Sequence, residues 1–184
     1  MSSPETVVLM PGDPNWPASL KERLATSAPR TLQVLGPPSL LTARKTALFC
    51  SGKAPGDAIL RAYDAARRMR DEGVTVISGF HSPIELECLR ILLRGSQPVI
   101  ICPARAIDPF RVPPQSRQAF NDGRVLYLSP FCGQPKRVTR ESAIRRNEVV
   151  AALADQAYVA HAEADGLTDH ILKQLVEWKV PIMR

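Results

Sequence analysis

The chain has few aromatic side chains and no long apolar run, and each of these features argues against one class of function. Phe, Trp and Tyr together make up 5% of its 184 residues, so an extended platform for stacking bases is not expected. No stretch of 18 consecutive apolar residues occurs, and no membrane-spanning helix is predicted. The first residues lack a basic segment followed by an apolar one. We therefore expect a cytoplasmic protein without a membrane partner.

Paired cysteines and the common nucleotide-binding signature are also absent. Cys50, Cys88, Cys102 and Cys132 are widely spaced, with no C-x-x-C pair and no histidine at metal-ligand spacing. We expect free, reduced thiols and no bound metal. The G-x-x-x-x-G-K-[ST] phosphate loop is missing, which argues against a P-loop nucleotidase.

Positive charge is in excess and is concentrated in one segment. The chain has 24 Lys and Arg against 18 Asp and Glu, a formal net charge of +6. Segment 136–146, KRVTRESAIRR, holds five cations and one acid. Such a segment favours an anionic partner, either a nucleic acid or a nucleotide.

Short apolar runs alternate with helical patterns after a proline-rich lead, 1–40. The predicted strands are 31–36, 46–52, 74–79, 98–103, 124–130, 156–161 and 179–183, and the predicted helices are 55–73, 83–95, 115–121, 143–154 and 167–177. Strands separated by helices at this spacing form right-handed βαβ units. We predict an α/β, Rossmann-like three-layer fold with a mostly parallel sheet covered on both faces. One domain is expected over 1–184, with the lead packed on its core.

Ligands of open α/β sheets bind outside the carboxyl ends of the strands, where two small-residue turns occur. Ser51, Gly52 and Lys53 end one predicted strand, and Ser78 and Gly79 end the next. Small residues before a helix let backbone N–H groups approach an anion. The alternative is a plain strand-to-helix turn that needs a glycine.

Arginines surround the predicted start of helix 143–154. We place Ser142 as its N-cap and Arg145, Arg146 and Asn147 in its first turn. Cations there oppose the helix dipole, and a bound phosphate would resolve the conflict. The alternative is a solvent-facing basic patch.

Two further strand ends carry polar residues. Gly166 and Thr168 precede the last helix and can form a phosphate-facing turn, although the acid Glu163 makes metal or ribose contact equally plausible. His81 can act as a base or be a solvated loop residue.

Several of these stretches resemble one family. SGK at a strand end, GVTVISGF before a helix, DPFRVPP and RRNEVVAALAD occur in the order seen in the DNA-processing protein A (DprA, or Smf) family. The resemblance implies a Rossmann-like fold, single-stranded DNA bound in a basic pocket above the strand ends, and homodimers that load the RecA recombinase. The family's Arg-Gly-Ile-Asp is replaced here by Ser82-Pro83-Ile84-Glu85. The chain resembles a minimal member with the core only and no winged-helix tail.

The patterns and the resemblance together define the candidate site. The candidate DNA- or phosphate-binding residues are Ser51, Gly52, Lys53, Ser78, Gly79, Arg140, Arg145, Arg146, Asn147, Gly166 and Thr168. No catalytic residue and no cofactor are predicted.

Two other functions stay open. A nucleotide-binding protein or nucleotide hydrolase on the same fold would use Glu85, Glu87 or Glu163 as acid–base groups, although the Pro-Gly-Gly-x-Gly-Thr motif of related phosphoribohydrolases is absent. A scaffold that has lost its ligand is the third hypothesis.

Overall fold

A single eight-stranded sheet forms the centre of the molecule. The computed structural model describes residues 5–183. The strands are β1 (Val7–Leu9), β2 (Leu32–Leu35), β3 (Lys45–Cys50), β4 (Thr75–Ser78), β5 (Val99–Ile101), β6 (Val125–Ser129), β7 (Gln156–His161) and β8 (Ile182–Met183). Their order across the sheet is β1-β2-β6-β5-β4-β3-β7-β8. The pairings β1–β2 and β2–β6 are antiparallel and the other five are parallel, so the predicted mostly parallel sheet is confirmed.

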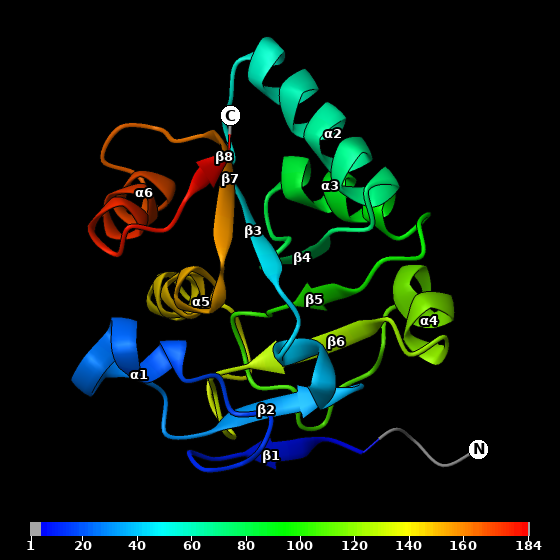
Figure 1. The fold of residues 1–184 in the computed structure, drawn as a ribbon, viewed down its shortest axis with the longest axis vertical. Helices are drawn as coiled ribbons and strands as arrows, with labels where there is room; N and C mark the ends of the chain where they lie inside the picture. Colours follow the sequence, from blue (N-terminus) through cyan, green and yellow to red (C-terminus); the bar gives the residue numbers. More distant parts are fainter. Residues whose placement is uncertain (1–4, 184) are drawn as a thin grey trace.

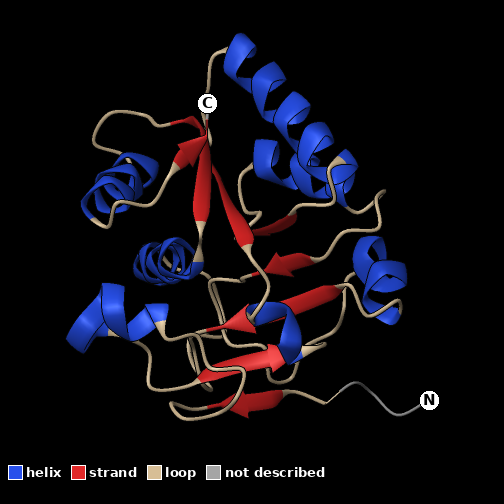
Figure 2. Ribbon diagram, in the orientation of Figure 1, coloured by secondary structure: helices blue, strands red, loops and turns tan. Residues whose placement is uncertain are grey.

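Helices cover both faces of this sheet. They are α1 (Ser19–Leu24), α2 (Gly56–Asp71), α3 (Pro83–Leu92), α4 (Pro114–Asn121), α5 (Arg140–Leu153) and α6 (Leu167–Glu177). Figure 1 shows α1, α5 and α6 on one face and α2, α3 and α4 on the other, and Figure 2 shows the same layers by secondary structure. The predicted three-layer α/β fold is therefore confirmed. Within residues 5–183, no helix is both long and apolar enough to cross a bilayer.

Strand β3 shows how one apolar run fills both layers of the core. All six of its residues are buried. Ala47 and Phe49 pack with the helices on one face, whereas Leu48 and Cys50 pack with those on the other. Successive side chains of a strand point to opposite faces, so a strand covered on both sides contributes apolar side chains to both layers. The two polar residues of β3, Lys45 and Thr46, lie at its start and are also buried.

The proline-rich lead contributes a strand that the sequence pattern did not predict. Val7 and Val8 of β1 are exposed and only Leu9 is buried, so three residues carry too little periodicity to be recognised. Further along the lead, Arg23 of α1 donates from Nη1 to the carbonyl oxygens of Ala152 (3.0 Å) and Ala154 (2.6 Å). These carbonyls end α5, where a cation is favoured.

Helix α5 begins earlier than the sequence suggested. Its N-cap is Thr139, whose Oγ1 accepts a hydrogen bond from the Ser142 N–H (3.1 Å), while Ser142 Oγ accepts one from the Thr139 N–H (2.9 Å). Placing Ser142 as the N-cap was wrong, because both residues are good caps and the reciprocal pair satisfies two N–H groups at once. Arg145 and Arg146 therefore lie in the second turn of the helix.

Candidate anion-binding site at the strand ends

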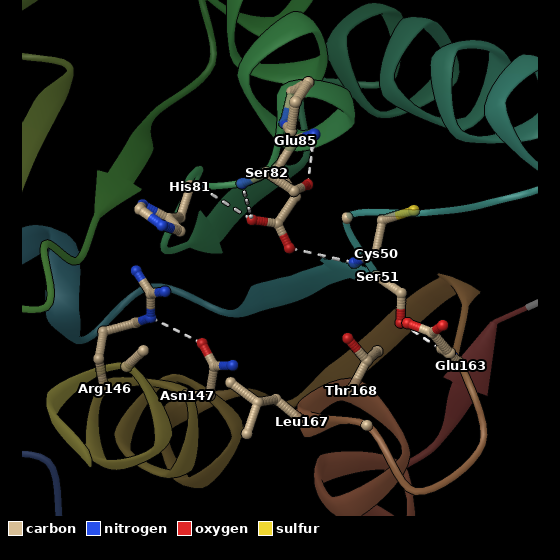
Figure 3. Close-up of a pocket in the computed structure, with 14 residues that line it drawn as sticks. Cys50, Ser51, His81, Ser82, Glu85, Arg146, Asn147, Glu163, Leu167 and Thr168 are labelled. Carbon is tan, nitrogen blue, oxygen red and sulfur yellow. Dashed lines mark hydrogen bonds between the residues drawn. The ribbon is translucent and has the colours of Figure 1, made fainter. Parts of the chain in front are cut away.

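A cavity of about 390 Å³ opens at the carboxyl ends of β3, β4 and β7. Its walls come from the end of β3, the loop before α3, one face of α5 and the loop before α6 (Figure 3). Six of the predicted site residues line it: Ser51, Gly52, Arg146, Asn147, Gly166 and Thr168. Parallel strands bring together turns that are far apart in the chain, as the topology predicts.

The other predicted site residues lie elsewhere. Lys53 and Arg140 are exposed and do not line the cavity, and Arg145 lines a different one. Ser78 and Gly79 are also absent from its lining. The Ser78 side chain is fully buried, and its Oγ accepts from the Phe80 N–H (3.2 Å), which shapes the loop.

Arg146 is the buried cation of the site. Its relative exposure is 4%; Nη1 donates to the Cys102 carbonyl (3.0 Å) and Nε to Asn147 Oδ1 (2.6 Å). It forms no salt bridge with any residue in 5–183. Burying a charge without a counter-charge costs free energy, and an anion bound beside this guanidinium would offset that cost.

Gly79 makes room for that guanidinium. A Cβ atom at this position would lie 1.8 Å from Arg146 Nη1 and 2.0 Å from Cζ. The sequence suggested that a small residue here lets the backbone approach a phosphate. In the structure the close neighbour is the Arg146 side chain, so Gly79 leaves the space that this guanidinium occupies.

Glu85, named from the sequence only as an acid–base group of the alternative hydrolase, is the main lining side chain that the predicted binding set omitted. Its carboxylate is buried and accepts three backbone hydrogen bonds: Oε1 from the Cys50 N–H (3.1 Å), and Oε2 from the N–H groups of His81 (2.9 Å) and Ser82 (3.3 Å). Figure 3 shows it between β3 and the start of α3. The pattern Ser82-x-x-Glu85 is a capping box and could have revealed this side chain.

Because Glu85 occupies these donors, the strand ends do not form an open cradle of N–H groups. Among the lining side chains, one cation, Arg146, stands against two carboxylates, Glu85 and Glu163. The formal charge of the lining is therefore −1 with His81 neutral. Exposed positive charge lies outside this lining, on Lys53, on Lys136 and Arg137 of the loop before α5, and on Arg140 at the start of that helix.

Besides Ser82, whose Oγ accepts from the Glu85 N–H, two further hydroxyl groups line the cavity. Ser51 Oγ accepts from the Glu163 N–H (2.9 Å), so its own proton is free to be donated. Thr168 is buried, and its side chain makes no hydrogen bond with the described residues. In Figure 3 its hydroxyl lies on the cavity side of α6. Both hydroxyls can donate to an anion.

The cavity offers no activated nucleophile or metal centre. Burial, with a smaller contribution from the Glu85 charge, raises the pKa of the Cys50 thiol to about 11, so this cysteine stays protonated. Cys50, Cys88, Cys102 and Cys132 are all free thiols, as expected. No group of three metal-ligating side chains exists within residues 5–183.

Fold and site together define a Rossmann-like α/β protein with a polar cavity at the carboxyl ends of its strands. The chain belongs to the family of DNA recombination-mediator protein A, whose sequence pattern matches residues 7–169. The resemblance noted in the sequence is thereby confirmed. No curated protein matches the chain by sequence comparison.

Two solved structures share the fold. DNA processing protein A (DprA) from Streptococcus pneumoniae superimposes with a TM-score of 0.79 at 19% identity, over 97% of this chain and 62% of that one. DNA processing protein A from Helicobacter pylori, described for its single-stranded DNA binding mode, gives 0.75 at 18% identity, over 97% and 79%. The chain thus spans less than two thirds of the length of the Streptococcus protein.

Proposed function

We propose that the protein binds single-stranded DNA and holds one phosphate of the strand in the strand-end cavity. The observation that carries this proposal is Arg146, a buried guanidinium that lacks a carboxylate partner among residues 5–183. A phosphate would supply the missing negative charge and accept charge-assisted hydrogen bonds. Ser51 and Thr168 offer hydroxyl donors in the same cavity.

The choice of DNA over other anions rests on the family and on the surface around the cavity. The family is described as a recombination mediator, and the related Helicobacter pylori protein is described as binding single-stranded DNA. Lys136 and Arg137 are exposed on the loop that leads into α5, and Arg140 is exposed at the first position of that helix. A polyanion that enters the cavity at one phosphate can place its neighbouring phosphates against this loop.

The main test replaces Arg146 by Gln, which removes the charge but keeps hydrogen-bond donors. We expect binding of a labelled single-stranded oligonucleotide, followed by fluorescence anisotropy, to weaken at least about tenfold, because a charge-assisted hydrogen bond contributes about 1.5–3 kcal/mol. The slope of log K against log salt should become shallower by about 0.7.

The matched control is Arg90→Gln, which removes one positive charge from an exposed residue of α3 that is paired with Glu87. Both variants should give the circular dichroism spectrum of the wild type. If R146Q binds the oligonucleotide as tightly as R90Q at low salt, Arg146 does not hold a phosphate and the proposal fails.

A free nucleotide is the second candidate ligand, and the two carboxylates favour it. Glu85 and Glu163 line the cavity with His81, and carboxylates accept hydrogen bonds from ribose hydroxyls. Thermal-shift measurements with mono- and dinucleotides separate the candidates. Stabilisation by mononucleotides without oligonucleotide binding would favour this ligand over DNA.

We also propose that the protein forms homodimers and interacts with the RecA recombinase, because the resemblance to the DprA family implies both. The family description as a recombination mediator supports the RecA proposal. Sedimentation velocity tests the dimer and co-precipitation tests RecA. A monomer at all concentrations, or no RecA retained on the immobilised protein, would remove the corresponding partner.

A further inference from the structure

A second cavity, of about 430 Å³, lies beside the first on helix α5. Ser142 and Arg145 line the second cavity, whereas the next residues along the helix, Ala143 and Arg146, line the first. Consecutive helical side chains point about 100° apart, so the two cavities occupy neighbouring faces of the same helix. A single strand that leaves Arg146 and crosses α5 meets this second cavity next.

One aromatic ring near the strand ends is available in this second cavity. Tyr127 is buried with its hydroxyl bonded to Ser116, and Phe110 packs on the Tyr127 ring with centroids 4.7 Å apart. Phe131 is half-buried and lines the cavity. Ser129 Oγ accepts from the Phe131 N–H (3.1 Å), which fixes the loop that carries the ring.

The polar lining suits a base better than a phosphate. Arg145 is held by Glu148 (3.3 Å) and by the Ser27 carbonyl, and its planar guanidinium can stack on a base. Glu141 is exposed and forms no salt bridge within residues 5–183. A carboxylate repels phosphate but accepts from the amino group of a cytosine. With Arg145 against Glu141, the lining carries no net charge.

We propose that this cavity is a base subsite, which receives a nucleobase of the strand whose phosphate lies at Arg146. The base stacks on Phe131, and its polar edge faces Glu141 and the Gln134 amide, which also line the cavity. The inference rests on the proposed single-stranded DNA binding and adds a base-dependent contribution to it.

The test compares two strands of equal length and charge, an oligodeoxycytidylate and an oligomer of abasic residues. Phe131→Ala should weaken binding of the cytidylate about tenfold in fluorescence anisotropy and leave binding of the abasic strand unchanged, because stacking needs a base. Phe131→Leu, which keeps most of the bulk, should show the same selectivity, and Phe131→Trp should retain the wild-type preference. Val138→Ala is the matched control, since Val138 is an exposed apolar residue of the same loop outside the cavity lining.

The outcomes separate the base subsite from the proposed function. The base subsite would be overturned if Phe131→Ala and Phe131→Leu bound the cytidylate as tightly as the wild type. It would also be overturned if these variants lost equal affinity for the cytidylate and for the abasic strand. The Arg146→Gln result could still support DNA binding in that case. A wild-type protein that binds neither strand would overturn both.

Discussion

Arg146 and Glu85 carry opposite charges into one cavity without forming a salt bridge, and backbone groups hold both in place. The guanidinium is seated by Gly79 and donates to the Cys102 carbonyl. The carboxylate is fixed by three N–H donors from two strand ends. In the cavity, Arg146 can therefore pair with an anionic ligand, whereas the carboxylate of Glu85 repels negative charge on that ligand.

The acid at Glu85 can be tested by a neutral replacement. Glu85→Gln should bind single-stranded DNA more tightly at low salt, because the formal charge of the lining changes from −1 to 0. Urea denaturation should also show that the free energy of unfolding of this variant is lower by about 1–3 kcal/mol. The reason is that the single amide oxygen of Gln leaves some of the three N–H donors without an acceptor.

Glu87→Gln is the control for this variant. It removes the same charge from the same helix, but the carboxylate pairs with Arg90 at the surface. If E85Q binds DNA no more tightly than E87Q, the internal acid does not oppose the ligand.

At the scale of elements, helix α5 connects the two cavities, and its start decides where its arginines point. The capping box of Thr139 and Ser142 begins the helix at Arg140. Arg146 then lies on the sheet-facing side and Arg145 on the neighbouring face. A helix that began at residue 143, as the local pattern suggested, would have put both arginines at its N-terminus. Two good caps three residues apart made the sequence ambiguous there.

The N-cap gives a prediction about stability. Thr139→Ala should lower the free energy of unfolding by about 1 kcal/mol, because the Ser142 N–H loses its acceptor. Chemical denaturation measures this change, and Thr139→Ser, which restores the hydroxyl, is the control. Equal stabilities of the alanine and serine variants would show that the helix start does not depend on this side chain.

At the scale of the whole molecule, the lead and the Rossmann-like core form one packed unit. Leu20 and Leu24 of α1 are buried in the core cluster that contains the apolar side chains of α5. Arg23 joins the same two helices by donating to carbonyl oxygens at the end of α5. Helix α1 thus supports α5, whose other end carries the candidate site.

This attachment predicts a long-range effect on stability. Arg23→Met should lower the free energy of unfolding by about 1–2 kcal/mol, because the last carbonyls of α5 lose a charged donor. Protease cleavage within the lead should also become faster. Lys21→Met, an exposed residue of the same helix, is the control. If both variants resist urea and protease equally, Arg23 does not hold the lead on the core.

The sequence by itself determined the order of strands and helices from β2 onward, the mostly parallel sheet and the edge at which the candidate site lies. These follow from local hydrophobic periodicity and from the rule that parallel strands end at one edge. The structure decided which strand-end residues face the cavity. Ser51, Arg146 and Thr168 do, whereas Lys53 and Arg140 do not.

The role of Glu85 and the cavity beside Phe131 were likewise decided only by the tertiary structure. Glu85 accepts from the Cys50 N–H, 35 positions earlier in the chain. The second cavity joins the loop after β6 to the face of α5 that carries Ser142 and Arg145. Local periodicity carries no information on contacts between distant segments, because these depend on how the packed layers bring the chain together.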